Sequence, residues 1–261
     1  MKKTVRRFLS LMLAAACAVS VITVNSAEVS AKNKYKKGDY ITFGSYEQDG
    51  KKKNGAEPIE WEVLDVKNGK ALVISKYILD AMPYNDYADI TWEKCALRQW
   101  LNKDFYNSAF KAGEKKKIIK MRLLNPDNKK SGIKGGKATK DSVFLLSVSE
   151  IRKYYKFNSW DERLMCGLSQ ELMTEGTKYA IDNGLATNAI TEEYYDLLYK
   201  SFEYNESCIG RVCAEWWLRT PGYEANRVCA VSACGDTGWD VYDAYAHFGY
   251  IGVRPAMWVK L

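Results

Sequence analysis

The sequence has one histidine, no proline- or serine-rich linker and no visible repeat. A Ser-His-Asp or Cys-His catalytic arrangement would have to use that residue, His247, which stands among aromatic residues in the stretch YDAYAHFGY. A packed or surface position suits a histidine in this setting better than a general-base role. Because nothing divides the chain after its leader, we expect residues 32–261 to form a single domain around one core.

Long apolar runs are also absent, apart from residues 8–24. Basic residues precede this run, and Val29-Ser30-Ala31 follows it with the small-residue spacing that signal peptidase requires. We therefore interpret residues 1–31 as a removed secretory signal, and predict a secreted or cell-surface protein with no transmembrane segment after leader removal. The alternatives are a membrane anchor, for which a run of about 17 apolar residues is short, and lipidation at Cys17, which the continuing apolar run disfavours.

Charge is unevenly distributed along the chain. Without residues 1–31, the 39 basic and 32 acidic residues become 35 and 31, a net charge of +4. Residues 111–140 hold eleven Lys or Arg against Glu114 and Asp127, whereas residues 181–261 hold six basic against eleven acidic residues. Such a basic patch can orient a protein on a polyanion, such as a wall polymer or an anionic cell surface. The plainer alternative is a solvated lysine-rich face. No nucleic-acid-binding module is recognisable, so we expect no nucleic-acid partner.

A β-hairpin is the clearest local pattern. Residues 59–66 and 71–75 are rich in β-branched and apolar side chains, and Asn68-Gly69 between them suits a type I′ turn. Period-two alternation places Trp61, Val63 and Asp65 on one face, with Glu60, Glu62 and Leu64 on the other. Residues 40–46 read as a further strand.

Helices are predicted in the middle of the chain. Thr91 is expected to cap a helix through about residue 110, with its core stripe formed by Leu97, Trp100, Leu101 and Phe105. Ser147 and Glu150 have the spacing of a capping box. Residues 171–181, ending before Gly184, and residues 191–204 are the other predicted helices.

Strands follow from residue 215 onward, in the runs 215–219, 227–233, 239–245 and 253–259. Pro255 interrupts the last run, which indicates an edge or a bulge because proline cannot donate to a ladder. The predicted fold class is therefore α+β, with antiparallel strands at both ends of the chain and helices between them.

Five motifs in order carry a family resemblance: ITFGSY at 41–46, PIEWEVL at 58–64, LRQWLN at 97–102, WWLRTPG at 216–222 and GVRPAMW at 252–258. Together they resemble a family of exported Gram-positive bacterial domains of unknown function. That family resembles the C-type-lectin-like fold in the branch of the formylglycine-generating enzyme. The resemblance implies that the first and last strands pair, bringing the Tyr40 and Val253 segments together, and that loops on one side carry the ligand site.

The chain departs from this family at residues 189–214, which we interpret as an insertion containing Cys208 and Cys213. The Glu-Pro-Asn and Trp-Asn-Asp triplets of calcium lectins are missing from suitable positions, so calcium-dependent sugar binding is not supported. Calcium is still conceivable at Asp236, Asp240 and Asp243, although their spacing lacks the terminal Glu of an EF-hand.

Six cysteines follow the leader, and an even count in an exported chain favours disulfides. They are Cys95, Cys166, Cys208, Cys213, Cys229 and Cys234. A straight strand puts Cys229 and Cys234 on opposite faces, which predicts different partners, whereas a turn that starts by Ala233 would allow a local bond between them. Cys208 and Cys213 flank Gly210 and are candidates for closing a small loop. Two metal alternatives remain: a zinc site formed by the last four cysteines, and a copper site at Cys229 and Cys234, in the manner of the formylglycine-generating enzyme.

No catalytic set stands out, whereas aromatic residues are abundant near the predicted loops. We therefore expect a non-enzymatic, exported interaction domain, without a required cofactor, that binds an extracellular glycan or surface protein. The candidate ligand-binding residues are Trp239, Tyr242, Tyr245 and Tyr250. The alternative function is a copper-dependent oxidase of peptidyl cysteine. Arg219 and Arg254, in the two C-terminal motifs, are expected to form buried or half-buried ion pairs.

Overall fold

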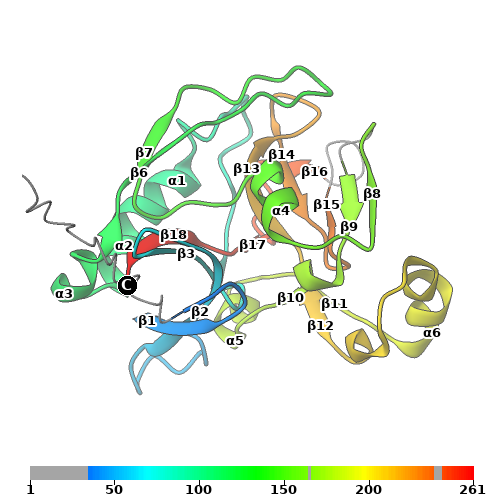
Figure 1. The fold of residues 1–261 in the computed structure, drawn as a ribbon, viewed down its shortest axis with the longest axis horizontal. Helices are drawn as coiled ribbons and strands as arrows, with labels where there is room; N and C mark the ends of the chain where they lie inside the picture. Colours follow the sequence, from blue (N-terminus) through cyan, green and yellow to red (C-terminus); the bar gives the residue numbers. More distant parts are fainter. Residues whose placement is uncertain (1–34, 164–165, 238–242) are drawn as a thin grey trace, which may run out of the picture. The chain divides into compact units, whose positions relative to one another are not determined.

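The hairpin predicted at Asn68 and Gly69 is part of a five-stranded antiparallel sheet (Figure 1). The computed structural model describes residues 35–163, 166–237 and 243–261. Asn68 and Gly69 have φ angles of 51° and 68°, the left-handed values that a type I′ turn requires. In spatial order the strands are β1 (Tyr40–Tyr46), β2 (Glu57–Lys67), β3 (Lys70–Ser75), β18 (Ala256–Lys260) and β5 (Ile118–Ile119).

Strand β2 contains a bulge that alters the predicted alternation. Val63 pairs with Val73 and Asp65 pairs with Leu72, so Leu64 is an extra residue without a partner in β3. Leu64 is only 1% exposed. The prediction that it would share an outer face with Glu60 and Glu62 is therefore wrong, whereas Trp61 and Val63 are buried as expected.

The first and last strands do not pair with each other. Strand β18 lies between β3 and β5, while β1 pairs with β2. The Val253 segment forms β17 (Gly252–Val253), which belongs to another sheet. The expected pairing of the Tyr40 and Val253 segments is wrong, because the β2–β3 hairpin occupies the position beside β18.

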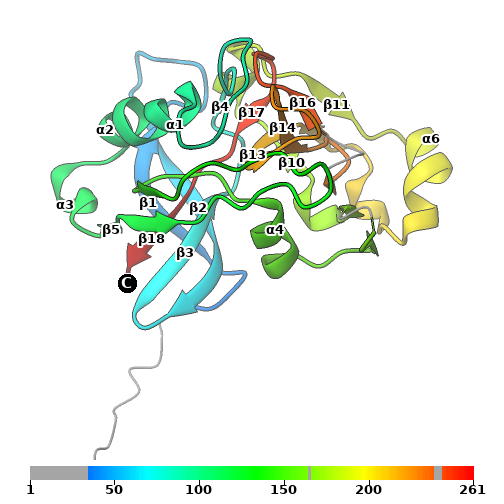
Figure 2. The same cartoon turned by 90° about the horizontal axis from the view of Figure 1, so that it is seen from above.

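A second, larger sheet collects the C-terminal strands (Figures 1 and 2). Its order is β4 (Asp80–Ala81), β17, β13 (Trp216–Pro221), β14 (Arg227–Val231), β15 (Asp236–Thr237), β9 (Cys166–Leu168) and β8 (Ser159–Asp161), and β16 (Asp243–Tyr245) pairs with β14. Pro255 separates β17 from β18, and both are inner strands of their sheets. The predicted edge position is therefore wrong: the proline lies where the chain passes from one sheet to the other.

Two small sheets complete the strands. One joins β10 (Thr174–Glu175), β12 (Val212–Ala214) and β11 (Thr187–Ala189), and the other pairs β6 (Met121–Leu123) with β7 (Thr139–Asp141).

The helix expected from Thr91 begins later and is not a uniform α-helix. It comprises α1 (Ala96–Trp100), a π-helical turn η1 (Leu101–Phe105) and α2 (Tyr106–Ala109). Cys95 caps it, because its sulfur accepts a hydrogen bond from the Arg98 amide, so the predicted Thr91 cap is wrong. The core stripe is confirmed at its three buried members, Leu97, Leu101 and Phe105, while Trp100 is half-buried.

Two further helix predictions are confirmed. Helix α4 (Val148–Tyr154) starts with the Ser147–Glu150 capping box. Thr191 caps α6 (Glu192–Tyr194), which continues through the turns η3 (Tyr195–Tyr199) and η4 (Lys200–Phe202). Two other short elements are α3 (Ala112–Lys115) and η5 (Glu206–Cys208).

The helix predicted at residues 171–181 is mostly absent. The segment forms a 3₁₀ turn η2 (Gln170–Leu172), strand β10 and a short α5 (Lys178–Asp182). Pairing of β10 with β12 takes the place of helical hydrogen bonds in the middle of the segment. Gly184 does have the positive φ, 100°, that suits a residue after a helix end.

The buried apolar side chains of the described residues form two clusters. The main cluster spans both large sheets and helices α1, α2 and α4. The second cluster is smaller and packs the 189–214 segment against the body of the chain; its buried members are Met173, Ile190, Tyr195, Tyr199, Tyr204, Cys208, Cys213 and Ala233.

The fold is a mixed α+β arrangement dominated by antiparallel strands, which confirms the predicted class at that level. Among the described helices, none has both the length and the apolar character that a membrane crossing requires.

The two motif arginines form buried ion pairs, as predicted. Arg219 pairs with Glu150 and donates to the Leu145 carbonyl at 2.7 Å. Arg254 pairs with Glu62 at 3.3 Å and donates to the Ser75 carbonyl at 2.8 Å. Both arginine side chains are 4% exposed.

The Glu150 carboxylate gives a test of this pairing. Burial acts to raise its pKa, but the Arg219 guanidinium and the Ser147 donors outweigh burial, so the pKa of Glu150 lies below the usual carboxyl value. Its stabilising contribution is therefore present at neutral pH and is lost as the pH falls through the folded-state pKa.

We expect Glu150→Gln to lower the free energy of unfolding by about 3 kcal/mol at pH 7, because it leaves a buried guanidinium without its counter-charge. Urea denaturation measures the change. Glu162→Gln is the control, since Glu162 pairs with Arg152 at 78% exposure and its loss should cost less than about 0.5 kcal/mol. Equal losses in the two variants would contradict the assignment.

Candidate functional site

Five ring side chains form a continuous group that we call the aromatic strip: Tyr87, Tyr245, His247, Phe248 and Tyr250. The Tyr87 and His247 ring centroids lie 4.8 Å apart, those of His247 and Phe248 4.9 Å, and those of Phe248 and Tyr250 5.0 Å. Tyr245 lies within 5.6–6.3 Å of Tyr87, His247 and Phe248. The two end rings are open to solvent, Tyr87 at 69% and Tyr250 at 42%.

Two segments far apart in the sequence build the strip. Strand β16 pairs with β14, and this pairing places Tyr245 opposite Arg227. The chain then turns, with the Phe248 amide donating to the Tyr245 carbonyl at 3.0 Å. The loop carrying Tyr87 joins it through the Asn85 amide, which donates to the Ala246 carbonyl at 3.0 Å. Backbone hydrogen bonds therefore hold the rings in place.

An ion pair adjoins the strip. The Arg227 guanidinium lies 4.6 Å from the Tyr245 ring centroid, and its Nε is 2.7 Å from Asp243 Oδ1. The Tyr223 amide donates to the other Asp243 oxygen at 2.6 Å. An open cavity of about 440 Å³ is lined by Arg227, Asp243, Tyr223 and Glu224. An ion pair thus lies beside the half-buried Tyr245 ring of the strip.

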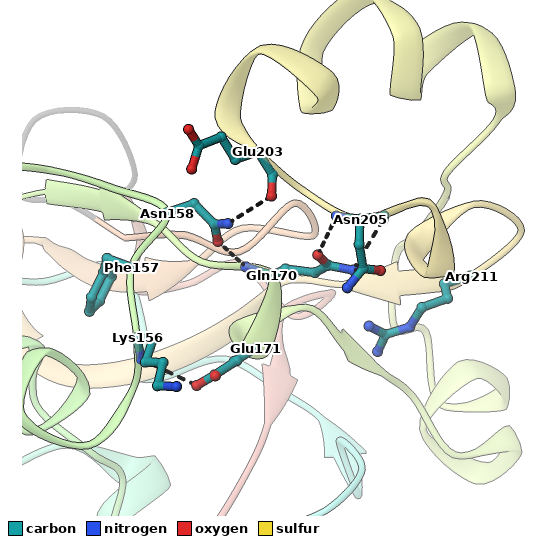
Figure 3. A pocket seen from close by; sticks show the side chains of 8 residues that line it. All are labelled: Lys156, Phe157, Asn158, Gln170, Glu171, Glu203, Asn205 and Arg211. Carbon is teal, nitrogen blue, oxygen red and sulfur yellow. Dashed lines mark hydrogen bonds between the residues drawn. The ribbon is translucent and has the colours of Figure 1, made fainter.

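A larger polar groove lies elsewhere on the chain (Figure 3). It has a volume of about 570 Å³ and is lined by Lys156, Phe157, Asn158, Gln170, Glu171, Glu203, Asn205 and Arg211. Many of its polar groups bond to one another. The Gln170 side chain exchanges hydrogen bonds with Asn205, and the Asn158 side chain donates to the Glu203 carbonyl at 3.1 Å. These amides therefore fasten the 189–214 segment to the 158–170 segment.

Comparison with known families gives one match. A family model described as a domain of unknown function, DUF6273, matches residues 68–261. The chain belongs to this family. No curated protein and no solved structure matches it. The matched DUF6273 range contains the motifs at 97–102, 216–222 and 252–258, and it contains every residue of the aromatic strip; the motifs at 41–46 and 58–64 precede it.

Two of the four predicted ligand-binding residues meet in the aromatic strip. Tyr245 and Tyr250 are joined there through Phe248, whereas Trp239 and Tyr242 lie outside the described residues. His247 is half-buried among rings, and its Nδ1 has no hydrogen-bond partner among the described residues. Tyr87 was not predicted, because it stands far away in the sequence and only the fold brings it to His247.

The described cysteines are free thiols. Cys95, Cys208, Cys213 and Cys229 are buried and Cys234 is half-buried, with no disulfide among these five; the Cys166 side chain lies outside the described residues. The disulfides expected from the even count are thus not present among them. Burial raises the pKa of Cys95 to about 12, that of Cys213 to about 11, and that of Cys229 well above its usual value.

Cys229 and Cys234 have different surroundings, although not through alternation along one strand, because β14 ends at Val231 and Cys234 lies in the turn that follows. Cys229 lies in the main cluster and donates to the Pro221 carbonyl at 3.2 Å, whereas Cys234 packs against the second cluster beside the Ser232 hydroxyl at 3.1 Å. The pair does not fit a copper ion held by both thiolates. The four-cysteine zinc arrangement is incomplete, because Cys208, Cys213 and Cys234 gather at the second cluster whereas Cys229 lies in the main cluster.

Two of the three aspartates considered as calcium ligands lie in the described residues, on different strands. Asp243 is engaged by Arg227 and by the Tyr223 amide. Asp236 lies in β15, where burial raises its pKa to about 6. Asp240 lies outside the described residues.

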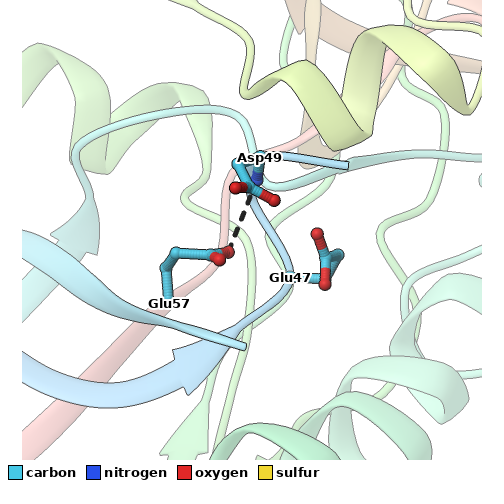
Figure 4. Close-up of side chains that lie close together, drawn as sticks. All are labelled: Glu47, Asp49 and Glu57. Atoms are coloured by element: carbon cyan, nitrogen blue, oxygen red, sulfur yellow. Dashed lines mark hydrogen bonds between the residues drawn. The ribbon is translucent and has the colours of Figure 1, made fainter. Parts of the chain in front are cut away.

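Another carboxylate group was not predicted: Glu47, Asp49 and Glu57, in and beside the β1–β2 connection (Figure 4). One carboxylate oxygen of each lies within 4.8 Å of the others, and such oxygens suit a hard divalent cation. Backbone and side-chain donors already satisfy two of them, because Glu57 accepts from the Gln48 amide at 2.7 Å and Asp49 accepts from Lys51 and Asn54. Glu47 Oε1 is buried and accepts no hydrogen bond from a described residue.

A titratable carboxyl lies close to one end of the aromatic strip. Glu215 stands between β12 and β13, and its charge acts together with burial to raise the pKa of Tyr250. Burial raises the pKa of Glu215 itself to about 7. The folded chain therefore holds a proton that the unfolded chain releases between about pH 4.5 and 7, so this residue makes the fold less stable as the pH rises through that range.

We expect Glu215→Gln to stabilise the protein at pH 8 and to have no effect at pH 4, where the native carboxyl is already neutral. After allowance for solvent screening the gain is about 1 kcal/mol, or a Tm increase of roughly 2–4 °C. Thermal unfolding at both pH values measures it. Glu193→Gln, at an exposed position on α6, controls for the loss of one negative charge; a gain at pH 4 as large as at pH 8 would contradict the prediction.

Proposed function

We propose that this chain is an exported, non-enzymatic interaction domain that binds a glycan through the aromatic strip. The single observation that carries the proposal is the strip itself: five ring side chains in contact with one another, on segments joined by backbone hydrogen bonds, with Tyr87 and Tyr250 exposed at its ends. Exposed aromatic groups of this kind mark binding surfaces, because burial of their faces against a partner is favourable.

The chemistry beside the strip suits a sugar. Aromatic faces pack against the C–H face of a pyranose ring, while sugar hydroxyls need paired donors and acceptors. Arg227 and Asp243 bond each other in one polar unit next to the Tyr245 ring, at the edge of an open cavity that a sugar hydroxyl can enter. Backbone hydrogen bonds join the segments that carry the rings before binding, so no backbone rearrangement is needed to bring them together when a ligand docks.

A surface protein is the other partner class that suits exposed tyrosines. Glycan binding is favoured because the strip is narrow, being five rings from two short segments, and because the polar unit beside it is small. The C-type-lectin-like fold that the motifs resemble is part of this proposal, and so is export to the cell surface.

The copper-oxidase alternative receives less support. It needs Cys229 and Cys234 as thiolates on one ion, whereas the two sulfurs lie in different hydrophobic clusters. The raised pKa of the buried Cys229 thiol also opposes thiolate formation.

We expect Tyr87→Ala/Tyr250→Ala to reduce retention on insoluble bacterial peptidoglycan, or affinity for a soluble β-glucan, at least tenfold without lowering Tm. Sedimentation with the insoluble polymer and calorimetry with the soluble one measure these effects. Tyr87→Phe/Tyr250→Phe should keep binding, since stacking needs the ring and not the hydroxyl.

Tyr194→Ala is the matched control, because Tyr194 is 54% exposed on α6, away from the strip in sequence. If neither polymer binds the unaltered protein, or if the control loses as much affinity as the double variant, the proposed function is wrong.

A further inference from the structure

Four lysines form a row across the five-stranded sheet, which we call the lysine row: Lys67, Lys70, Lys260 and Lys117. Lys67 pairs with Lys70 across the β2–β3 turn, and Lys70 pairs with Lys260 across β3 and β18. The Lys260 amide donates to the Lys117 carbonyl at 2.9 Å, continuing the register of β18 with β5. Directly opposite residues of antiparallel strands point to the same face, and all four side chains are exposed.

The row lies at the end of the sheet where the β2–β3 turn and the C-terminus meet (Figure 2). Neighbouring strands are about 4.8 Å apart, so three steps spread the four backbone positions over roughly 14 Å. None of the four lysines forms an ion pair or side-chain hydrogen bond within the described ranges. Asp65, two residues before Lys67 on β2, is the acidic side chain nearest to the row along that strand.

Such a row is unfavourable for the fold alone, because like charges placed directly opposite each other in a sheet destabilise it. Lysines on edge strands commonly prevent aggregation, but Lys70 and Lys260 stand on the inner strands β3 and β18. Solubility calls for interspersed charges of both signs and not for a line of one sign. The arrangement therefore points to an anionic ligand.

We propose that the lysine row binds a linear polyanion with repeated phosphate groups, such as a phosphodiester polymer. A line of ammonium groups fits successive charges along an extended chain better than a flat anionic surface. The β6–β7 ribbon, which follows β5 along the chain, carries a further exposed basic pair, Arg122 directly opposite Lys140. This proposal stands on the strand register and is independent of the glycan site.

The test compares two fourfold variants of equal charge with the unaltered protein, using long-chain inorganic polyphosphate as the probe. The row variant carries Gln at positions 67, 70, 117 and 260. The control variant carries Gln in place of Lys52, Lys53, Lys94 and Lys103, which are exposed lysines outside the row. Fluorescence anisotropy over a range of salt concentrations gives Kd and its salt dependence.

We expect the row variant to bind polyphosphate at least tenfold more weakly and the control less than threefold. The slope of log K against log salt should fall by about 3 in the row variant, because each lost phosphate contact removes roughly 0.7–0.9. The Tm of the row variant should be unchanged or higher, since like-charge pairs are removed, and this result separates lost binding from lost folding.

Equal losses in the two variants, or no salt-dependent binding by the unaltered protein, would overturn the proposal. A third arm uses vesicles containing phosphatidylglycerol. If the vesicles bind and polyphosphate does not, the row recognises an anionic membrane surface and the linear-polymer assignment is wrong.

Discussion

The arrangement of the two large sheets depends on the contacts that the Arg254 guanidinium makes. Arg254 lies between β17, in one sheet, and β18, in the other. It donates to Ser75 at the end of β3, pairs with Glu62 of β2, and lies 5.0 Å from the ring centroid of Trp216 in β13. Because the side chain is 4% exposed, an isolated charge there would be costly, and the three contacts together specify how the C-terminal strands cross from one sheet to the other.

Both proposed binding surfaces follow from strand pairing around that crossing. On the β17 side, the pairing of β14 with β16 and the loop before α1 bring the rings of the aromatic strip together. On the β18 side, the five-residue register with β3 aligns Lys260 with Lys70. Neither surface is a buried cleft in which sulfur, imidazole and carboxylate converge; the described thiols lie in two hydrophobic clusters. The side chains that these two surfaces expose to solvent are aromatic and charged, which suits the binding of a ligand.

Sequence patterns predicted the elements that depend on neighbouring residues. The type I′ turn at Asn68 and Gly69 and the Ser147–Glu150 capping box are confirmed, because each depends on the conformation of a few consecutive residues. The helix at residues 171–181 was wrong, since β10 found a partner in β12 far along the chain. The Leu64 bulge was equally invisible, because a bulge is defined by the partner strand.

The candidate site residues likewise fall into those that the sequence predicted and those that only the tertiary structure brought together. The sequence alone determined the α+β class, the pairing of the two motif arginines with carboxylates, and Tyr245 and Tyr250 as candidate ligand-binding residues. Only the tertiary structure decided that Tyr87 joins those rings, that Cys229 lies apart from Cys208, Cys213 and Cys234, and that Lys117 and Lys260 stand in one row with the hairpin lysines. The physical reason is that local backbone preferences act over a few residues, whereas these groupings depend on register between strands separated by tens to hundreds of residues.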